Sequence, residues 1–163
     1  MKVIKDNNIR LRPIRLPEDL PIALPWYQDE EVLYFSEGVG TSAYGLPTIE
    51  RMYKYLTTVG EVYLIEVHDR HNWLPVGDVT LSKDMIPIVI GDQDYRGKGI
   101  GKRVIKLLIE QAKEFNWEQI KVNKVYEYNV ASRKLFEGLG FKQTATNVDD
   151  SRRKYYSYEL KLE

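Results

Sequence analysis

The segment Tyr95-Arg96-Gly97-Lys98-Gly99-Ile100-Gly101-Lys102 decides how this chain is interpreted. It lies between a short apolar run at residues 86–90 and a strongly amphipathic helical pattern. A glycine-rich turn between a strand and a helix points several backbone N–H groups at one place, where the positive end of the helix dipole also acts. The segment therefore predicts a binding site for a phosphate or pyrophosphate group.

The spacing of this segment excludes the common nucleotide-binding loops. A Walker loop has Gly, four residues, and then Gly-Lys followed by Ser or Thr, but here the first position is Arg96 and the last is Arg103. A dinucleotide fingerprint needs a third glycine where this chain has Lys102, and an acidic residue about 20 positions further on. Neither is present. What remains is Arg-x-x-Gly-x-Gly, although a tight turn kept for packing also fits.

A second pattern stands further along the chain, where residues 126–141 read YEYNVASRKLFEGLGF. Asn129 is followed at the third position by Ser132, then by an apolar pair and by Gly140-Phe141. In order and separation, the two segments resemble the coenzyme A loop and the second signature of the GNAT superfamily of N-acetyltransferases. The resemblance covers residues 76–141 well and residues 1–75 in outline.

The resemblance implies that acetyl-CoA is the cofactor and that backbone N–H groups hold its pyrophosphate. In the family two central strands splay apart, and the pantetheine arm pairs with the exposed strand. The cofactor-binding residues so implied are Val89, Ile90, Gly91, Arg96, Gly97, Lys98, Gly99, Ile100, Gly101, Lys102 and Asn129. Positive charge near the adenosine end of the cofactor would come from Lys98, Lys102 and Arg103. The same residues also fit a solvated start of a helix. Asn129 also suits a helix N-cap, and both roles are compatible.

Acetyl transfer to an amine benefits from a general acid. The residue that usually serves as this acid in the family is missing from this chain. Many family members have a tyrosine at the position of Phe136, and phenylalanine cannot donate a proton. Ser132 occupies the position of a serine in relatives that acetylate ribosomal-protein N-termini. We take Ser132 as the candidate acid, although it also fits the first turn of a helix. Tyr126 and Tyr128 are reserves.

The general base is sought among carboxylates near the fourth family strand. Asp84 stands just before that strand and is the candidate base, with Asp78 and Glu66 behind it. Each of them also fits a carboxylate on the surface or in a turn.

The acceptor segment is expected within residues 24–56, which vary with the acceptor in this superfamily. Its aromatic residues are Trp26, Tyr27, Tyr34, Phe35, Tyr44, Tyr53 and Tyr55, and its acidic residues include Asp29, Glu30, Glu31 and Glu37. Rings and carboxylates suit a cationic amine, but buried rings and solvated acids explain the same composition. The leading hypothesis is direct acetyl transfer to a primary amine of a small molecule. The alternatives are a peptide or ribosomal-protein N-terminal acetyltransferase, and a non-catalytic acyl-CoA-binding module.

Composition sets the frame for these hypotheses. The length of 163 residues suits one N-acetyltransferase domain over residues 1–163. Lys+Arg and Asp+Glu both total 24, so no net charge favours nucleic acid or a membrane surface. The chain has no cysteine, and His68 and His71 lack partners at metal-ligand spacing, so no metal site is expected. The first residues do not resemble a signal peptide. We expect a cytoplasmic monomer or small oligomer such as a homodimer.

Hydrophobic periodicity predicts the order of the elements. Strands are expected at residues 9–14, 61–67, 76–82, 86–91, 119–125 and 155–162, and helices at residues 48–56, 99–115 and 130–139, the last ended by Gly140. This order predicts an α+β fold built on one mixed, mostly antiparallel sheet with splayed central strands and flanking helices.

Overall fold

The described part of the chain, residues 1–38 and 40–163 of a computed structural model, forms eight strands, five α-helices and two 3-10 turns. The strands are β1 (Ile4–Asp6), β2 (Ile9–Pro13), β3 (Glu61–Asp69), β4 (Asn72–Leu81), β5 (Ile88–Ile90), β6 (Gln119–Tyr126), β7 (Lys142–Val148) and β8 (Lys154–Lys161). The helices are α1 (Leu20–Ala23), η1 (Leu24–Gln28), α2 (Glu30–Ser36), α3 (Leu46–Val59), η2 (Gln93–Tyr95), α4 (Ile100–Glu114) and α5 (Val130–Gly138).

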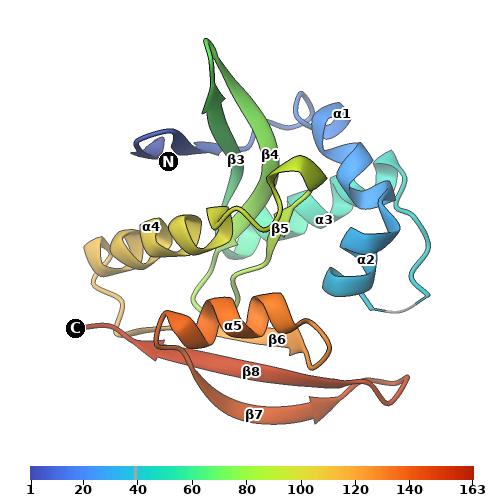
Figure 1. The fold of residues 1–163 in the computed structure, drawn as a ribbon, viewed down its shortest axis with the longest axis vertical. Coiled ribbons are helices and arrows are strands. Elements are labelled where there is room, and N and C mark those ends of the chain that lie inside the picture. The colour runs from blue at the N-terminus through green and yellow to red at the C-terminus, as the bar shows by residue number, and fades with distance from the viewer. Residues whose placement is uncertain (39) are drawn as a thin grey trace.

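The strands form two antiparallel sheets rather than one mixed sheet (Figure 1). The first has the order β1-β2-β3-β4-β5 and the second the order β6-β8-β7. No ladder joins β5 to β6 among the described residues, so the sheets part at these two strands. The predicted α+β fold with splayed central strands is confirmed. We call the place where β5 and β6 part the split.

Both faces of the five-stranded sheet are covered, so β3 and β4 carry long runs of buried residues rather than a clean alternation of buried and exposed positions. Tyr63 and Ile65 of β3 belong to the core that includes α4, whereas Leu64 packs in the core beneath α1 and α3. Figure 1 shows α4 on one side of the strands and the α1–α3 group on the other. The two hydrophobic cores therefore lie on opposite faces of this sheet, and the core with α4 also contains Ile120 and Tyr158 of the second sheet.

The helix predicted at residues 99–115 is confirmed as α4, which buries Val104, Ile105 and Leu108 completely. Gly99 caps its N-terminus with a φ of 78°, a left-handed conformation that glycine adopts at little cost. Gly140 has a φ of 93° just after α5, as expected for the end of that helix.

The elements that escaped the sequence prediction include β1, α2 and β7. Helix α2 is short, but its signals are present: Asp29 is its N-cap and accepts from the Glu31 N–H at 2.9 Å. Helix α3 begins at Leu46 rather than at Thr48, because Pro47 suits a first turn and Gly45 caps it.

A buried ion network fastens the start of the helical layer to the sheet. The Arg12 guanidinium of β2 donates to both carboxylate oxygens of Asp19 at 3.0 Å and to Glu66 at 3.3 Å. Glu66 also accepts from Arg10 at 2.6 Å, and the Arg15 N–H donates to Asp19. Because Arg12 and Asp19 are both buried, each depends on the other for compensation of its charge.

Removal of Asp19 is expected to destabilise the fold strongly. Asp19→Ala leaves the Arg12 charge buried without its bidentate partner, and we expect a loss of about 3 kcal/mol in the free energy of unfolding. Urea denaturation measures this loss. Glu18→Ala is the matched control because Glu18 is an exposed neighbour. Equal midpoints for the two variants would show that the network contributes little.

Candidate functional site

The edge of β5 that faces the split carries free backbone groups. In the β4–β5 register Val89 pairs with Asp78, and Gly91 donates its N–H to β4 at 2.8 Å. Hydrogen-bonded and non-bonded pairs alternate in antiparallel ladders. Ile88 and Ile90 therefore direct their N–H and C=O groups away from β4 and into the split.

This register changes which residues of β5 can offer backbone groups to a ligand. The sequence predicted Val89, Ile90 and Gly91, but the Val89 groups are used within the sheet. The Ile90 and Gly91 carbonyls accept from Arg96 at 2.8 and 3.0 Å, which leaves the Ile90 N–H. Ile88, which the sequence analysis did not single out, has both groups directed into the split. The alternation along β5 would have indicated Ile88 if the pairing of β5 with β4 had been known.

The loop that follows β5 presents a row of backbone donors. Gly97 and Gly99 have φ angles of 70° and 78°, and a Cβ on either would meet no atom within 4 Å. Within the part of the chain that the structure describes, the N–H groups from Gly97 to Lys102 have no hydrogen-bond partner. These donors stand at the N-terminus of α4, where the helix dipole is positive. The predicted loop residues are thus brought together in a geometry suited to an anion.

The loop end of α4 lies beside the split. A Cβ on Gly101 would lie 3.4 Å from Leu135 of α5 and 4.0 Å from Ile88 of β5. The start of α4, the edge of β5 and the side of α5 therefore meet at one place. Lys98 and Lys102 are exposed around it and add positive charge.

The Arg96 side chain binds other parts of the protein. Besides the two carbonyls at the end of β5, its Nη2 donates to Asp29 at 3.0 Å, and its Nη1 lies 3.3 Å from Glu31. Both carboxylates belong to the first turn of α2 or its cap. The guanidinium is engaged in these contacts, and the Arg96 N–H donates to the Gln93 carbonyl at 3.3 Å, so a direct contact of Arg96 with the cofactor stays a prediction.

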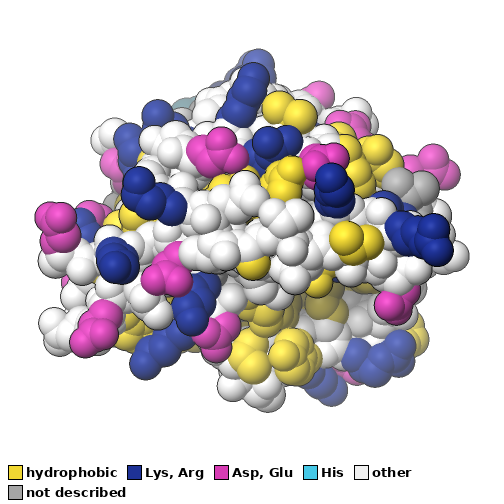
Figure 2. Space-filling view, turned by 90° about the horizontal axis from the view of Figure 1, so that it is seen from below, with side chains coloured by type: hydrophobic (Ala, Val, Ile, Leu, Met, Phe, Trp, Pro, Cys, Tyr) yellow, Lys and Arg dark blue, Asp and Glu magenta, His cyan; other side chains and the backbone are white. Residues whose placement is uncertain are grey.

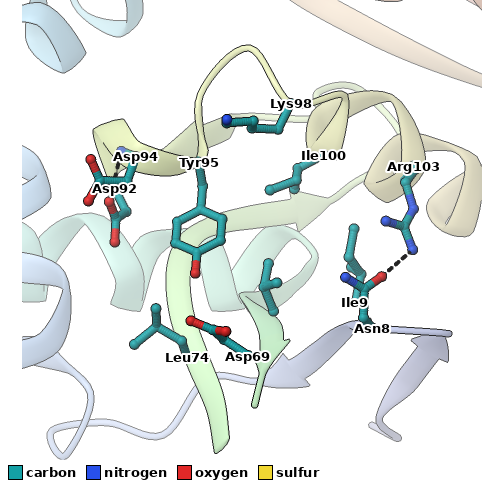
Figure 3. Close-up of a pocket in the computed structure, with 11 residues that line it drawn as sticks. Asn8, Ile9, Asp69, Leu74, Asp92, Asp94, Tyr95, Lys98, Ile100 and Arg103 are labelled. Atoms are coloured by element: carbon teal, nitrogen blue, oxygen red, sulfur yellow. Dashed lines mark hydrogen bonds between the residues drawn. The ribbon is translucent and has the colours of Figure 1, made fainter.

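A cavity of about 580 Å³ opens on the β2–β4 side of the same loop (Figure 3). Tyr95 points into it towards Asp69, and Asp92 and Asp94 stand at one side. Arg103 lines the opposite side, where it donates to Asn8 at 2.9 Å. The three carboxylates outnumber the two cations that also line the cavity, Lys98 and Arg103, so its net charge opposes a polyphosphate. The split, and not this cavity, is therefore the favourable side of the loop for a pyrophosphate.

The start of α5 bears the second predicted group. Asn129 is its N-cap, and the Asn129 Oδ1 accepts from the Ser132 N–H at 3.2 Å. Ser132 stands half-buried in the first turn. Phe136 is 2% exposed and packs against Phe141 and Tyr158. The position at which the family resemblance implies a tyrosine is therefore filled by a core side chain.

The three candidate bases lie in different surroundings. Asp84 is exposed in the loop before β5, where the Lys121 N–H of β6 donates to the Lys83 carbonyl at 3.2 Å. That hydrogen bond links the two sheets at the end where β5 and β6 begin, so Asp84 lies at the closed end of the split. Glu66 belongs to the arginine network.

Asp78 is the carboxylate nearest to the β5 edge by register, since it pairs with Val89. It is 2% exposed, and its Oδ2 accepts from the hydroxyls of Tyr27 and Tyr53, each at 2.7 Å. Burial raises the pKa of Asp78 to about 6, although the two tyrosine hydrogen bonds act in the opposite direction. The pairing of these two rings with Asp78 was not anticipated from the sequence.

The aromatic residues of the predicted acceptor segment divide into two groups. Trp26, Tyr27 and Tyr53 are buried, whereas Tyr34 is partly exposed and stacks on Tyr128 at 4.4 Å. Tyr128 in turn stacks on Tyr126 at 5.1 Å, and the Lys124 ammonium lies 4.8 Å from the Tyr126 ring. Figure 2 shows charges of both signs interspersed on one face of the molecule, with hydrophobic side chains visible between them at the upper right and near the lower edge.

Comparison with known proteins agrees with this geometry. The model of the acetyltransferase (GNAT) family matches residues 85–141, which include β5, the loop, α4, β6 and α5. Over these residues the chain resembles the GNAT family. An uncharacterized protein of Methanocaldococcus jannaschii is 30% identical over 105 residues, which are 61% of this chain; the chain spans only 21% of that relative.

Two solved acetyltransferase structures share their fold with nearly the whole chain. Spermidine N-acetyltransferase from Vibrio cholerae, in complex with CoA and spermine, has a TM-score of 0.77 and 16% identity, covering 96% of this chain and 97% of the other. An acetyltransferase from Salmonella typhimurium modifies the N-terminal serine of ribosomal protein L7/L12. It has a TM-score of 0.79 and 12% identity, covering 99% of this chain and 100% of the other. No helix among the described residues is both long and apolar enough to cross a membrane.

Asp78 is expected to make the stability of the fold depend on pH. Because its pKa is raised from 3.8 to about 6, the folded state binds this proton more tightly than the unfolded state. The resulting stabilisation is complete below about pH 4 and is lost as pH rises through 6, by about 3 kcal/mol at most. Urea denaturation from pH 4 to 7 measures it.

The comparison variant for that measurement is Asp78→Asn, which keeps an acceptor for the tyrosine hydroxyls and carries no charge. We expect it to flatten the dependence on pH between 4 and 6, whereas Asp84→Asn at the exposed turn leaves the wild-type curve unchanged. A wild-type slope that survives in Asp78→Asn would assign the titration to another group.

Proposed function

We propose that this chain is an acetyl-CoA-dependent N-acetyltransferase that moves an acetyl group directly to a primary amine. The observation that carries the proposal is the row of unpaired N–H groups from Gly97 to Lys102 beside the split of the two sheets. A diphosphate at a helix N-terminus next to a free strand edge is what coenzyme A requires. The match to the GNAT family model over this same region supports the proposal.

The residues around the split fit the parts of this cofactor. The N–H groups of the loop would hold the pyrophosphate, with Lys98 and Lys102 adding attraction from the surface. The free backbone groups of Ile88 and Ile90 would pair with the amides of the pantetheine arm. Asn129 uses its Oδ1 as a cap, so its side-chain NH₂ remains for the arm. Bound acetyl-CoA supplies an activated thioester, and the protein supplies its orientation.

The transfer forms a C–N bond and breaks the C–S bond, so the amine must lose protons and the thiolate must gain one. Ser132 at the start of α5 is the proposed donor to the thiolate. Between the carboxylates we favour Asp78 as the final proton acceptor, because Asp84 lies exposed at the closed end of the split. A proton would reach Asp78 through a tyrosine hydroxyl that already donates to it.

The acceptor is proposed to be a small molecule with a cationic amine. The support is local: Glu37 at the end of α2 interacts with the Tyr44 side chain, and burial raises the pKa of both groups. Tyr44 stacks on Tyr27 at 5.9 Å, and Tyr27 leads to Asp78. A carboxylate among rings suits an ammonium group.

A peptide N-terminus is the second candidate acceptor, favoured by Ser132 and by Phe136 in place of tyrosine. A non-catalytic acyl-CoA-binding module is the third candidate. All three are compatible with a cytoplasmic protein of one domain, which we also propose.

A thiol-release assay tests the function. Acetyl-CoA is incubated with the protein and with polyamines, aminoglycosides, amino acids or short peptides, and free CoA thiol is measured. We expect release with a small amine and little with peptides. The reverse preference would establish the second candidate. Stabilisation by acetyl-CoA in a thermal shift assay, without release from any acceptor, would favour the binding module.

Gly99→Ala is expected to weaken CoA binding about tenfold, because a Cβ at φ 78° costs about 1–2 kcal/mol and turns the N–H groups of the loop. Isothermal titration with CoA measures the change. Gly138→Ala is the control, since Gly138 ends α5 without a positive φ and a Cβ there would meet no atom within 4 Å. Unchanged affinity in Gly99→Ala would remove the loop from the binding site.

The proton-transfer assignments are tested with three variants. With the amine found in the assay, Ser132→Ala and Asp78→Asn are each expected to lower kcat by about 10²-fold, and Asp84→Asn by less than threefold. The pH dependence of kcat should lose its acidic limb in Asp78→Asn only. A large loss in Asp84→Asn with full activity in Asp78→Asn would return the role of base to Asp84.

A further inference from the structure

Helix α2 is attached to both sheets at the end of the split opposite to the closed end. Its first turn is joined to the end of β5 through Arg96, and it contacts both β5 and β6. Near its last turn, the Tyr34 carbonyl accepts from the Tyr128 hydroxyl at 2.5 Å and the Glu37 carbonyl accepts from Tyr126 at 3.3 Å. Figure 1 shows α2 beside β5 and near the end of β6. The helix therefore lies across the end where the two strands part.

Arg96 is the link between this helix and the loop. Its side chain binds two elements, since it donates to carbonyls at the end of β5 and to Asp29 at the cap of α2, while its own backbone begins the glycine-rich turn. The side chains of Arg96 and Asp29 are 21% and 27% exposed, so solvent screens their attraction only in part. Partial burial opposes ionisation of Asp29, but hydrogen bonds from Arg96 and from the Glu31 N–H lower its pKa below the usual range.

The packing next to this link is tight. A Cβ on Gly91 would lie 2.1 Å from the Trp26 ring, so the segment that leads into α2 sits directly on the end of β5. The buried Nη1 of Arg96 makes no hydrogen bond among the described residues, even though Glu31 lies 3.3 Å away. The guanidinium is thus held on one side by strong bonds and on the other by a looser ion pair.

We propose that Arg96 is a positioning residue that fastens the cofactor loop to α2, so that CoA bound at the loop orders the helix beside which the acceptor amine enters. The inference rests on the proposed function, because it takes the loop to be the CoA site. It adds a role for a helix that holds none of the predicted cofactor-binding residues. Coupling between two sites is reciprocal, so a change in α2 must alter the affinity for CoA.

The test uses CoA itself and a matched pair of substitutions on α2. Asp29→Asn keeps the N-cap, because asparagine caps helices as well as aspartate does, but it loses the charge that Arg96 binds. Glu30→Gln removes the same charge one residue later, at an exposed position that does not contact Arg96. Isothermal titration should show about fivefold weaker CoA binding in Asp29→Asn and less than twofold change in Glu30→Gln.

A double-mutant cycle assigns the effect to the link. The double variant Asp29→Asn/Arg96→Gln should bind CoA no more weakly than Arg96→Gln alone. The reason is that Arg96→Gln already removes the interaction that Asp29→Asn would remove. Equal affinities of Asp29→Asn and Glu30→Gln, or effects that multiply in the double variant, would overturn the proposal.

Hydrogen exchange separates this role from a merely structural one. In the wild type, CoA should slow the exchange of α2 amides from Val32 to Ser36, and this slowing should be lost in Asp29→Asn while the midpoint of thermal unfolding changes little. Identical slowing in both proteins would also overturn the proposal. Failure of the wild type to bind CoA would instead contradict the proposed function, and the two failures are therefore distinguishable.

Discussion

The unpaired edge of β5 is the constraint on which the rest of the structure depends. A strand edge presents donors and acceptors that must be satisfied, covered or used. Here β4 takes the groups of Val89, the Arg96 guanidinium takes the carbonyls of Ile90 and Gly91, and the groups of Ile88 remain directed into the split. Among the described residues no ladder pairs this edge with β6, although one hydrophobic core contains residues of both sheets. The structure thereby keeps one edge available to a ligand.

Arg96 explains why the loop and the helical layer behave as one assembly. A lysine could not replace it, since a single ammonium lacks the planar fork that reaches two carbonyls and a carboxylate together. Its position directly before Gly97 means that the same residue that anchors α2 also sets where the row of N–H groups begins. The positioning role that we propose for this side chain comes in addition to the prediction that Arg96 belongs to the cofactor-binding loop.

The fold and the cofactor loop were accessible from the sequence, but the chemistry around the acceptor was not. Glycines at 97 and 99 and a long amphipathic pattern are local signals, and the helix from Ile100 to Glu114 followed from them. The register of β5 depends on β4, so the sequence named Val89 where the structure turns Ile88 into the split. The meeting of Tyr27, Tyr53 and Asp78 joins η1, α3 and β4, a tertiary contact that no local pattern contains. The short α2 and the exposed β7 were missed because their hydrophobic periodicity is weak.

The central claim is that coenzyme A binds in the split, with its pyrophosphate on the loop and its arm along β5. Residue-resolved amide exchange by NMR, with and without CoA, tests it most directly. The claim predicts slower exchange for the amides from Gly97 to Lys102 and for Ile88 and Ile90, with little change at Val89, whose N–H is already bonded to β4. CoA that binds while these amides exchange at unchanged rates, or that protects only residues around the cavity near Asp69 and Leu74, would contradict the claim.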